Sequence, residues 1–192
     1  MPRVMPGYRE KARLKILEKA YLVFSKKGFY NTTMDDIAIE VGVTKGTLYL
    51  YFKSKEELFR AMADQYSSGF TENILKKFEN KNFTENSGLF FDIYFRMNSG
   101  SEPLIYELAS ISTRNEEIKK MLFEETAKDK GQFLKFFEMQ VKKGYLPKDT
   151  DIKMISAVSG ILAGGLMERI YLGMSKKEAR MLWTKTIEKL VK

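Results

Sequence analysis

The chain of 192 residues contains no cysteine and no histidine, and it holds only four prolines. Without cysteine there is no disulfide, no thiolate nucleophile and no zinc site built from thiolates. Without histidine there is no Ser-His-Asp triad and no imidazole acid–base catalysis. No pair of carboxylates stands out with an obvious catalytic role either. The sequence therefore predicts a protein that is not an enzyme, with no catalytic residue, metal ion or cofactor.

Long hydrophobic runs are also missing. The longest nearly apolar run, residues 155–167, is too short and too rich in Ser and Gly to span a bilayer. At the N-terminus a charged helix is expected where a secretory signal would have an apolar core. We therefore expect a cytoplasmic protein with no membrane partner.

Positive charge is in excess and is unevenly spread. The net charge is +8, and residues 1–60 hold 12 Lys or Arg against 7 Asp or Glu. Residues 61–192 hold 21 against 18. A basic N-terminal third suits an electrostatic footprint on DNA phosphate, although many unrelated proteins are basic.

The hydrophobic pattern predicts an all-α fold of about nine helices. No stretch shows sustained alternation of period two, and apolar residues recur at helical spacing instead. The expected helices cover about residues 8–27, 33–42, 44–50, 54–80, 89–97, 103–112, 115–143 (with a possible break near Gly131), 151–172 and 176–191.

Two short helices joined by a tight turn are expected between residues 33 and 50. Thr33 caps the first helix, with Asp36 as its capping-box partner. Gly42 ends this helix in a left-handed conformation, and Thr44 caps the second. Such a pair is the helix-turn-helix, whose second helix enters the major groove of DNA.

A wider pattern surrounds this motif. It consists of Ala20, Phe24, Gly28, Thr32, Ile37-Ala38, Gly42-Val43-Thr44, Gly46, Tyr49, Tyr51-Phe52, Ser54-Lys55-Glu56 and Leu58. Over about residues 10–60 the chain resembles the TetR family of bacterial and archaeal transcriptional regulators. The resemblance implies a helix-turn-helix DNA-binding domain over residues 1–53. It also implies a helical ligand-binding and dimerisation domain over residues 54–192.

The second helix of the motif carries the candidate base contacts. Lys45 donates well to guanine acceptors, and the methyl group of Thr47 suits a thymine methyl. Gly46 lets the backbone approach a base, although steric relief beside the first helix is an alternative. The resemblance implies that these three positions contact bases.

Other polar groups near this helix suit phosphate. The hydroxyls of Tyr49 and Tyr51 are good hydrogen-bond donors to phosphate, although either ring can instead pack inside the DNA-binding domain. Lys55 lies in the first turn of the helix expected over residues 54–80, where backbone amides also favour an anion. The alternative for Lys55 is an ordinary solvated surface lysine. The full predicted DNA-binding set is Thr33, Thr44, Lys45, Gly46, Thr47, Tyr49, Tyr51 and Lys55.

The last two helices are the expected homodimer interface. Small residues at helical spacing allow close approach of a second helix, and larger apolar residues supply packing. The alternative is that the same stripe packs inside the monomer. The predicted interface consists of Ser156, Ser159, Gly160, Ala163, Gly164, Leu182, Ile187 and Leu190.

Aromatic residues and methionines gather in the middle helices. As a group they fit a large apolar ligand pocket, although any one of them is as readily explained as plain core. The candidates are Phe90, Tyr94, Phe95, Tyr106, Met121, Phe133, Phe137 and Met167. A hydrophobic effector is expected, such as a fatty acyl-CoA or a multidrug-type compound.

Together these features predict a dimeric transcriptional repressor. It binds a palindromic double-stranded operator and is released when the effector binds. Two alternatives remain open. One is a small-molecule-binding protein on the same fold without specific DNA reading, and the other is a nonspecific DNA binder.

Overall fold

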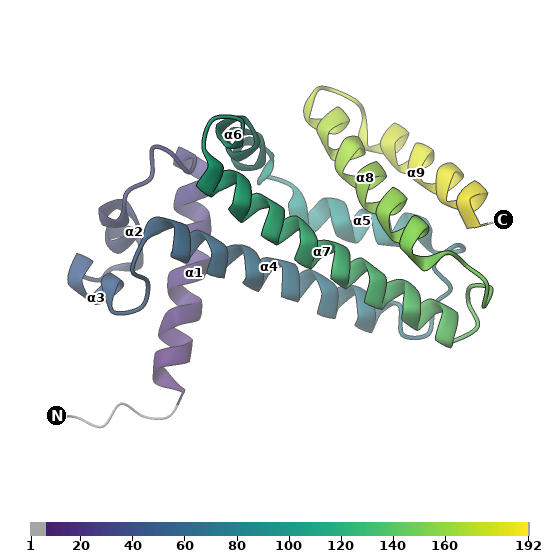
Figure 1. The fold of residues 1–192 in the computed structure, drawn as a ribbon, viewed down its shortest axis with the longest axis horizontal. Helices are drawn as coiled ribbons and strands as arrows, with labels where there is room; N and C mark the ends of the chain where they lie inside the picture. The colour runs from purple at the N-terminus through teal and green to yellow at the C-terminus, as the bar shows by residue number, and fades with distance from the viewer. Residues whose placement is uncertain (1–6, 192) are drawn as a thin grey trace. The chain divides into compact units, whose positions relative to one another are not determined.

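A computed structural model describes residues 7–191, apart from the side chains of Asp129 and Gln132. This described part contains nine α-helices and no strand, which confirms the predicted all-α architecture (Figure 1). The helices are α1 (Tyr8–Lys27), α2 (Met34–Val41), α3 (Lys45–Tyr49), α4 (Lys55–Lys77), α5 (Ser87–Asn98), α6 (Glu102–Ser112), α7 (Glu116–Lys142), α8 (Ile152–Tyr171) and α9 (Lys176–Val191).

Most helix bounds agree with the sequence pattern, and one expected feature is wrong. The possible break near Gly131 does not occur, because α7 continues through it as a single helix. A glycine inside a helix costs only about 1 kcal/mol relative to alanine, so one glycine in 27 residues does not interrupt the hydrogen-bond ladder.

The chain forms two compact units. Unit 1 contains the described residues up to Tyr66 together with Pro103–Glu125, and unit 2 contains Ser67–Glu102 and the chain from Thr126 onward. The helices α4 and α7 each begin in unit 1 and end in unit 2. The assignment of residues 1–53 to DNA binding and of residues 54–192 to ligand binding and dimerisation stays a prediction.

Unit 1 is built around an apolar core that joins α1, α2 and α3. Ile16, Ala20 and Phe24 line one face of α1, and all three are buried. Ile37 of α2 and Leu48 of α3 are fully buried in the same cluster. The short helices α2 and α3 are therefore held in place by tertiary packing, which is where most helical stability in proteins originates.

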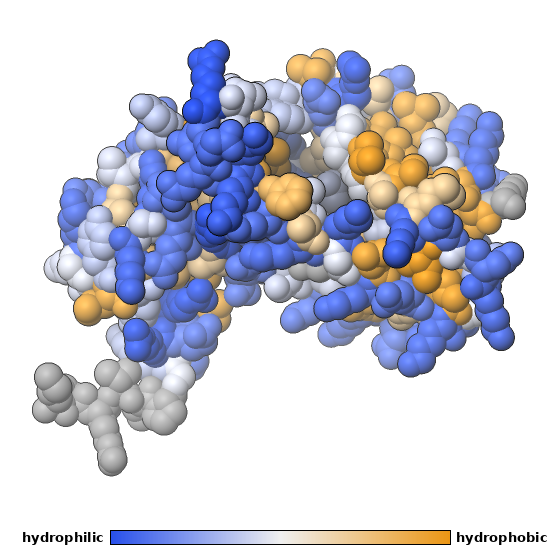
Figure 2. Space-filling view, viewed as in Figure 1, coloured by the Kyte–Doolittle hydropathy of each residue, from blue (hydrophilic) through white to orange (hydrophobic). Residues whose placement is uncertain are grey.

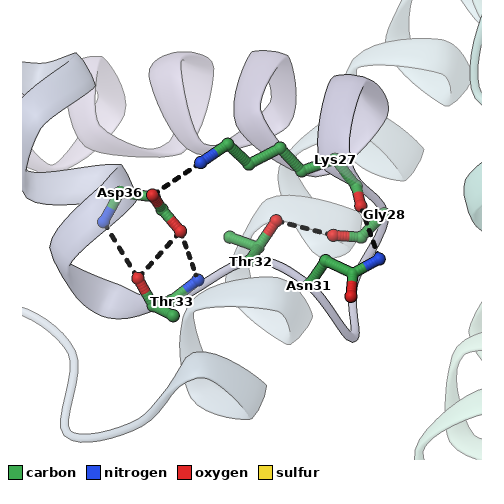
Figure 3. Close-up of polar contacts among 6 residues, drawn as sticks. All are labelled: Lys27, Gly28, Asn31, Thr32, Thr33 and Asp36. Carbon is green, nitrogen blue, oxygen red and sulfur yellow. Dashed lines mark hydrogen bonds and ion pairs between the residues drawn. The ribbon is translucent and has the colours of Figure 1, made fainter.

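The start of α2 is fixed by the predicted capping box (Figure 3). The Asp36 amide donates to Thr33 Oγ1 over 3.1 Å, and the Thr33 amide donates to Asp36 Oδ2 over 2.9 Å. Lys27 Nζ lies 2.6 Å from Asp36 Oδ1 and ties the end of α1 to this cap. The hydrogen bond from Lys27, followed by those from Thr33, lowers the pKa of Asp36 from 3.8 to about 2.

Unit 2 has an aromatic core. Trp183 of α9 is fully buried and stacks on Phe90 of α5 at a centroid distance of 5.6 Å. Its indole N–H donates to the Ser87 carbonyl over 2.7 Å, so the polar edge of the ring is satisfied. Phe83 packs edge-on against Phe137 at 5.0 Å. These contacts join α5, α7 and α9 through one apolar cluster.

A buried glutamine closes the end of this unit. Gln140 of α7 has no exposed surface, and its Oε1 accepts from the Phe83 amide over 2.8 Å. Its Nε2 donates to the Lys81 carbonyl over 3.1 Å. Because both ends of the amide are paired, the side chain fixes the α4–α5 connection against α7 without an unsatisfied polar group.

Neutralising Asp36 provides a test of the α2 cap through pH. The folded-state pKa of about 2 lies below the ordinary value of 3.8, so this carboxylate stabilises the fold above pH 4. That stabilisation is lost as the pH falls through 2 to 4. We expect Asp36→Asn to lower the free energy of unfolding at pH 7 by more than at pH 3, measured by urea denaturation.

The control is Asp149→Asn, which removes a carboxylate whose side chain is exposed. It should leave the unfolding free energy nearly unchanged at both pH values. An Asp36→Asn effect that is equal at pH 7 and pH 3 would contradict the proposed role of the charged carboxylate.

Candidate nucleic-acid interface

The turn between α2 and α3 has the geometry that the sequence predicts. Gly42 adopts a left-handed conformation with φ 80° and ψ 37°, which only glycine takes up without strain. Its amide donates to the Ala38 carbonyl over 3.0 Å, and so does the amide of Val43. Thr44 then caps α3, since its Oγ1 accepts from the Thr47 amide over 3.1 Å.

One face of α3 is buried and the other is open. Leu48 is 0% exposed and Phe52 is 1% exposed, so both anchor this segment in the core of unit 1. Lys45 and Gly46 are exposed on the other side. A side chain at Gly46 would meet only Thr44 Oγ1, at 3.9 Å. The steric-relief alternative for Gly46 therefore has no support, and a DNA surface has room to approach the backbone there.

The two side chains predicted to read bases each have an intramolecular partner. Lys45 Nζ lies 2.8 Å from Asp35 Oδ2 on α2, and this hydrogen bond raises the pKa of Lys45. Thr47 Oγ1 lies 2.9 Å from Thr44 Oγ1 and is half-buried. Both side chains of the Lys45–Asp35 pair are more than half exposed, and exposed ion pairs are weak, so this pair holds Lys45 only loosely.

The predicted phosphate contacts differ in exposure. Thr33 is exposed, and its hydroxyl belongs to the α2 cap. Tyr49 is 43% exposed, which leaves its side chain accessible to DNA. Tyr51 is half-buried and packs against the core of unit 1, as the alternative for a tyrosine allowed. Leu50, the next residue along the chain after Tyr49, is 73% exposed.

Lys55 lies in a different environment from the one that the sequence suggests. Its ammonium donates to the Phe29 carbonyl over 2.8 Å and to the Tyr30 carbonyl over 3.3 Å. It also lies 4.5 Å from the centroid of the Phe29 ring. Burial lowers the pKa of Lys55, with nearby Glu56 and Glu107 opposing that shift. The alternative of a solvated surface lysine is therefore wrong.

The contact between Glu107 and the α1–α2 turn was not predicted from the sequence. This residue lies on α6, and its carboxylate accepts from the Phe29 amide over 2.7 Å and from the Tyr30 amide over 2.9 Å. No local pattern in the sequence reveals this contact, because 78 positions separate Glu107 from Phe29.

The predicted ligand-pocket residues do not form a single open site. Tyr106 and Met121 belong to unit 1, and the other six belong to unit 2. Phe90 and Phe137 are buried in the aromatic core. The hollow lined by Phe70, Thr71, Ile74, Phe90, Phe133 and Phe136 encloses only about 10 Å³, which is at the limit for one water molecule. As the alternative anticipated, these rings act as packed core in this structure.

The predicted dimer interface is partly wrong. Ser156, Ser159, Ala163 and Ile187 are each at most 2% exposed, so they have no surface left to cover with a second chain. They face the core because α8 and α9 pack side by side and against α5. The alternative, packing within the monomer, holds for these four. The others, Gly160, Gly164, Leu182 and Leu190, are partly or fully exposed.

A neighbouring face of α8 is apolar and exposed. Figure 2 shows hydrophobic side chains gathered over α8 and α9. Met154 is 49% exposed and Ile161 is 77% exposed, and no atom lies within 4 Å of a side chain built at Gly164 or Gly165. These positions recur at helical spacing, so they share one face. Leu182 of α9 is also exposed, at 39%.

Among residues 7–191 no helix combines the length and apolar character that a membrane-spanning segment requires. Within the same described part, no group of three or more acidic side chains has the arrangement of a metal site.

Comparison with known proteins agrees with this geometry. Residues 16–62 match the model of bacterial regulatory proteins of the tetR family. The HTH-type transcriptional regulator YfiR of Bacillus subtilis is 41% identical over 75 residues, which are 39% of this chain and 35% of that protein. The match therefore spans about a third of the length of this relative.

Two further similarities extend beyond residues 16–62. IcaR of Staphylococcus epidermidis, a negative transcriptional regulator of the biofilm operon icaADBC, is 28% identical over 126 residues. These are 65% of this chain and 68% of IcaR. The crystal structure of the regulator FadR from Bacillus subtilis, in complex with stearoyl-CoA, superposes with a TM-score of 0.71 and 20% identity. It covers 93% of this chain and 97% of FadR.

The segment matched by the family model is the α1–α4 head that carries the helix-turn-helix, and the nine-helix fold agrees with that of a solved regulator. Over residues 16–62 the chain is therefore similar to the bacterial regulatory proteins of the tetR family.

Proposed function

We propose that the protein is a sequence-specific DNA-binding transcriptional regulator that acts as a dimeric repressor. The observation that carries this proposal is the α3 surface. Leu48 is buried on one side, while Lys45, Gly46 and Tyr49 are exposed on the other. A short helix anchored in this way presents donors and an open backbone to a groove. The net charge of +8 and the family match support DNA as the partner.

Lys45, Gly46 and Thr47 are the proposed base contacts. Thr33, Thr44, Tyr49 and Tyr51 are the proposed positions next to phosphate. The name of IcaR, a negative regulator, supports repression as the direction of control. A two-fold dimer would place two heads about 34–36 Å apart, in successive major grooves of a palindrome.

Selection of genomic fragments tests the function. Purified protein is mixed with sheared bacterial DNA at near-physiological salt, and the retained fragments are sequenced. A recurring palindrome bound about 10³-fold or more tightly than mixed-sequence DNA supports a specific regulator. Uniform retention identifies a nonspecific DNA binder. No retention identifies a protein on this fold that does not read DNA.

Replacing Lys45 should weaken binding to the recovered palindrome. A good side-chain contact to a base edge is worth about 1–3 kcal/mol, so Lys45→Ala should raise the dissociation constant roughly tenfold to a hundredfold. Fluorescence anisotropy with a labelled duplex measures this. The matched control is Lys177→Ala, an exposed lysine on α9, which should bind like the unmodified protein. Equal effects of the two variants would refute the assignment of Lys45.

The dimer should form through the exposed face of α8 and the adjoining part of α9. Met154, Ile161, Gly164 and Leu182 offer apolar or small surface there. Ile161→Glu places a charge at its centre and should convert a dimer to a monomer, as measured by light scattering after gel filtration. Ile39→Glu, at a position of similar exposure on α2, should stay dimeric. A monomeric unmodified protein, or an Ile161→Glu dimer, would contradict this interface.

A hydrophobic effector would bind within the aromatic cluster of unit 2. The FadR complex with stearoyl-CoA supports a fatty acyl thioester as the first compound to test. Because the hollow beside Phe90 and Phe133 is only about 10 Å³, binding requires these rings to separate. The ligand thus selects a second conformational state of unit 2. Release from DNA follows if, in that state, the two DNA-binding heads of the dimer fit the operator less well.

Stearoyl-CoA should raise the unfolding temperature and weaken operator binding. At a hundred times its dissociation constant a ligand stabilises the native state by about 2.7 kcal/mol. Thermal unfolding and anisotropy measure the two effects, and free coenzyme A is the matched control. Stabilisation without loss of DNA affinity would contradict release by this compound, and no stabilisation would exclude it as the effector.

A further inference from the structure

The turn between α1 and α2 is held from both sides by two charged residues. The amides of Phe29 and Tyr30 donate to the Glu107 carboxylate, and the carbonyls of the same two residues accept from Lys55 Nζ. All four residues belong to unit 1. Two consecutive residues thus have both their backbone donors and their backbone acceptors paired with side chains of opposite charge, and such charged partners make strong hydrogen bonds.

Gly28 makes room for this arrangement. A side chain there would overlap Glu107 Oε2 and would lie 2.9 Å from Glu107 Cδ. Gly28 also has φ 79°, which disfavours any other residue. Space and backbone conformation at the end of α1 therefore both fit the approach of the Glu107 carboxylate.

The Lys55 ammonium is already occupied. It has three N–H donors, and two of them point to the carbonyls of Phe29 and Tyr30. The Phe29 ring lies against the same ammonium at 4.5 Å. A phosphate contact would require Lys55 to give up these partners, after which the Phe29 carbonyl would keep only a 3.4 Å hydrogen bond from the Thr32 amide. By contrast, Lys45 is exposed and has only a solvent-accessible carboxylate partner.

We propose that Lys55 and Glu107 form a clamp on the α1–α2 turn, and that Lys55 promotes DNA binding by positioning this turn and not by contacting phosphate. This proposal rests on the proposed function. Thr33, the cap of α2, follows Tyr30 by three residues, so the clamp fixes how the chain enters α2. The cap and α3 then follow within one packed unit. Lys55 and Glu107 are thus positioning residues for the α2–α3 surface.

The salt dependence of DNA binding separates positioning from phosphate contact. The logarithm of the binding constant falls with the logarithm of salt concentration, with a slope of about −0.9 for each phosphate that a cation neutralises. Lys55→Met removes the charge and the donors. We expect it to weaken binding to the recovered palindrome roughly tenfold while leaving the slope unchanged. A slope shallower by about 0.9 would show that Lys55 neutralises a phosphate, and would overturn the proposal.

Glu107→Gln is the second variant, and it removes the charge that draws the two amides. A carboxylate cannot itself bind phosphate, so weakening roughly tenfold at unchanged slope identifies loss of positioning. The double variant should lose less than the product of the two single losses, because both act on one turn. Lys45→Ala, at an exposed lysine of α3 that is a proposed base contact, is the comparison for loss of a direct contact with DNA. Full affinity in both Lys55→Met and Glu107→Gln would refute the clamp.

Hydrogen exchange tests the clamp without DNA. In the unmodified protein the Phe29 and Tyr30 amides should exchange slowly, and Glu107→Gln should accelerate exchange at both. The Glu178 amide, which donates to Ser175 Oγ at the start of α9 in unit 2, is the control and should be unaffected. Fast exchange at Phe29 and Tyr30 in the unmodified protein would refute the clamp even if every variant binds DNA poorly. If the protein selects no palindrome, the proposed function fails while this measurement still reports on the clamp.

Discussion

A helix of five residues is too short to persist alone in water, and α3 depends on the burial of Leu48. This contact decides which side chains of α3 face outward. Because Leu48 and Phe52 lie in the core of unit 1, Lys45, Gly46 and Tyr49 remain accessible. The proposed DNA surface is therefore a consequence of hydrophobic packing on the opposite side of the same short segment.

The conformation of the chain just before α2 likewise depends on contacts with other helices of unit 1. The turn after α1 carries backbone groups that no helix satisfies, and buried polar groups without partners are costly. Glu107 and Lys55 supply those partners from α6 and α4. A lysine at the start of α4 thus has a structural task within the head. In unit 2, by contrast, aromatic ring contacts such as Trp183 on Phe90 fill the interior and leave little empty space.

Local signals allowed much of the fold to be predicted from the sequence. The capping residues Thr33 and Thr44 and the left-handed Gly42 mark helix ends through contacts within four residues. These signals act at short range, so a sequence shows them directly. The α2–α3 surface followed from the same reasoning, because the buried and exposed positions alternate with the helical period.

Contacts between distant residues limited the prediction of the sites. Glu107 and Phe29 are 78 positions apart, so the contact of Glu107 with the α1–α2 turn left no trace in any local pattern. Ser156 and Ser159 share their small size with Gly164, and only the packing of α8 against its neighbours shows which of them is buried. The aromatic residues of unit 2 were recognisable as a group. Whether they enclose a cavity depends on a few ångströms of packing that composition does not encode.

The most direct test of the account is a structure of the protein bound to the palindrome that it selects. We expect α3 to lie in the major groove with Lys45 and Thr47 at base edges. Lys55 should still donate to the carbonyls of Phe29 and Tyr30. A complex in which α3 lies outside the groove, with DNA bound to another surface, would contradict the central claim.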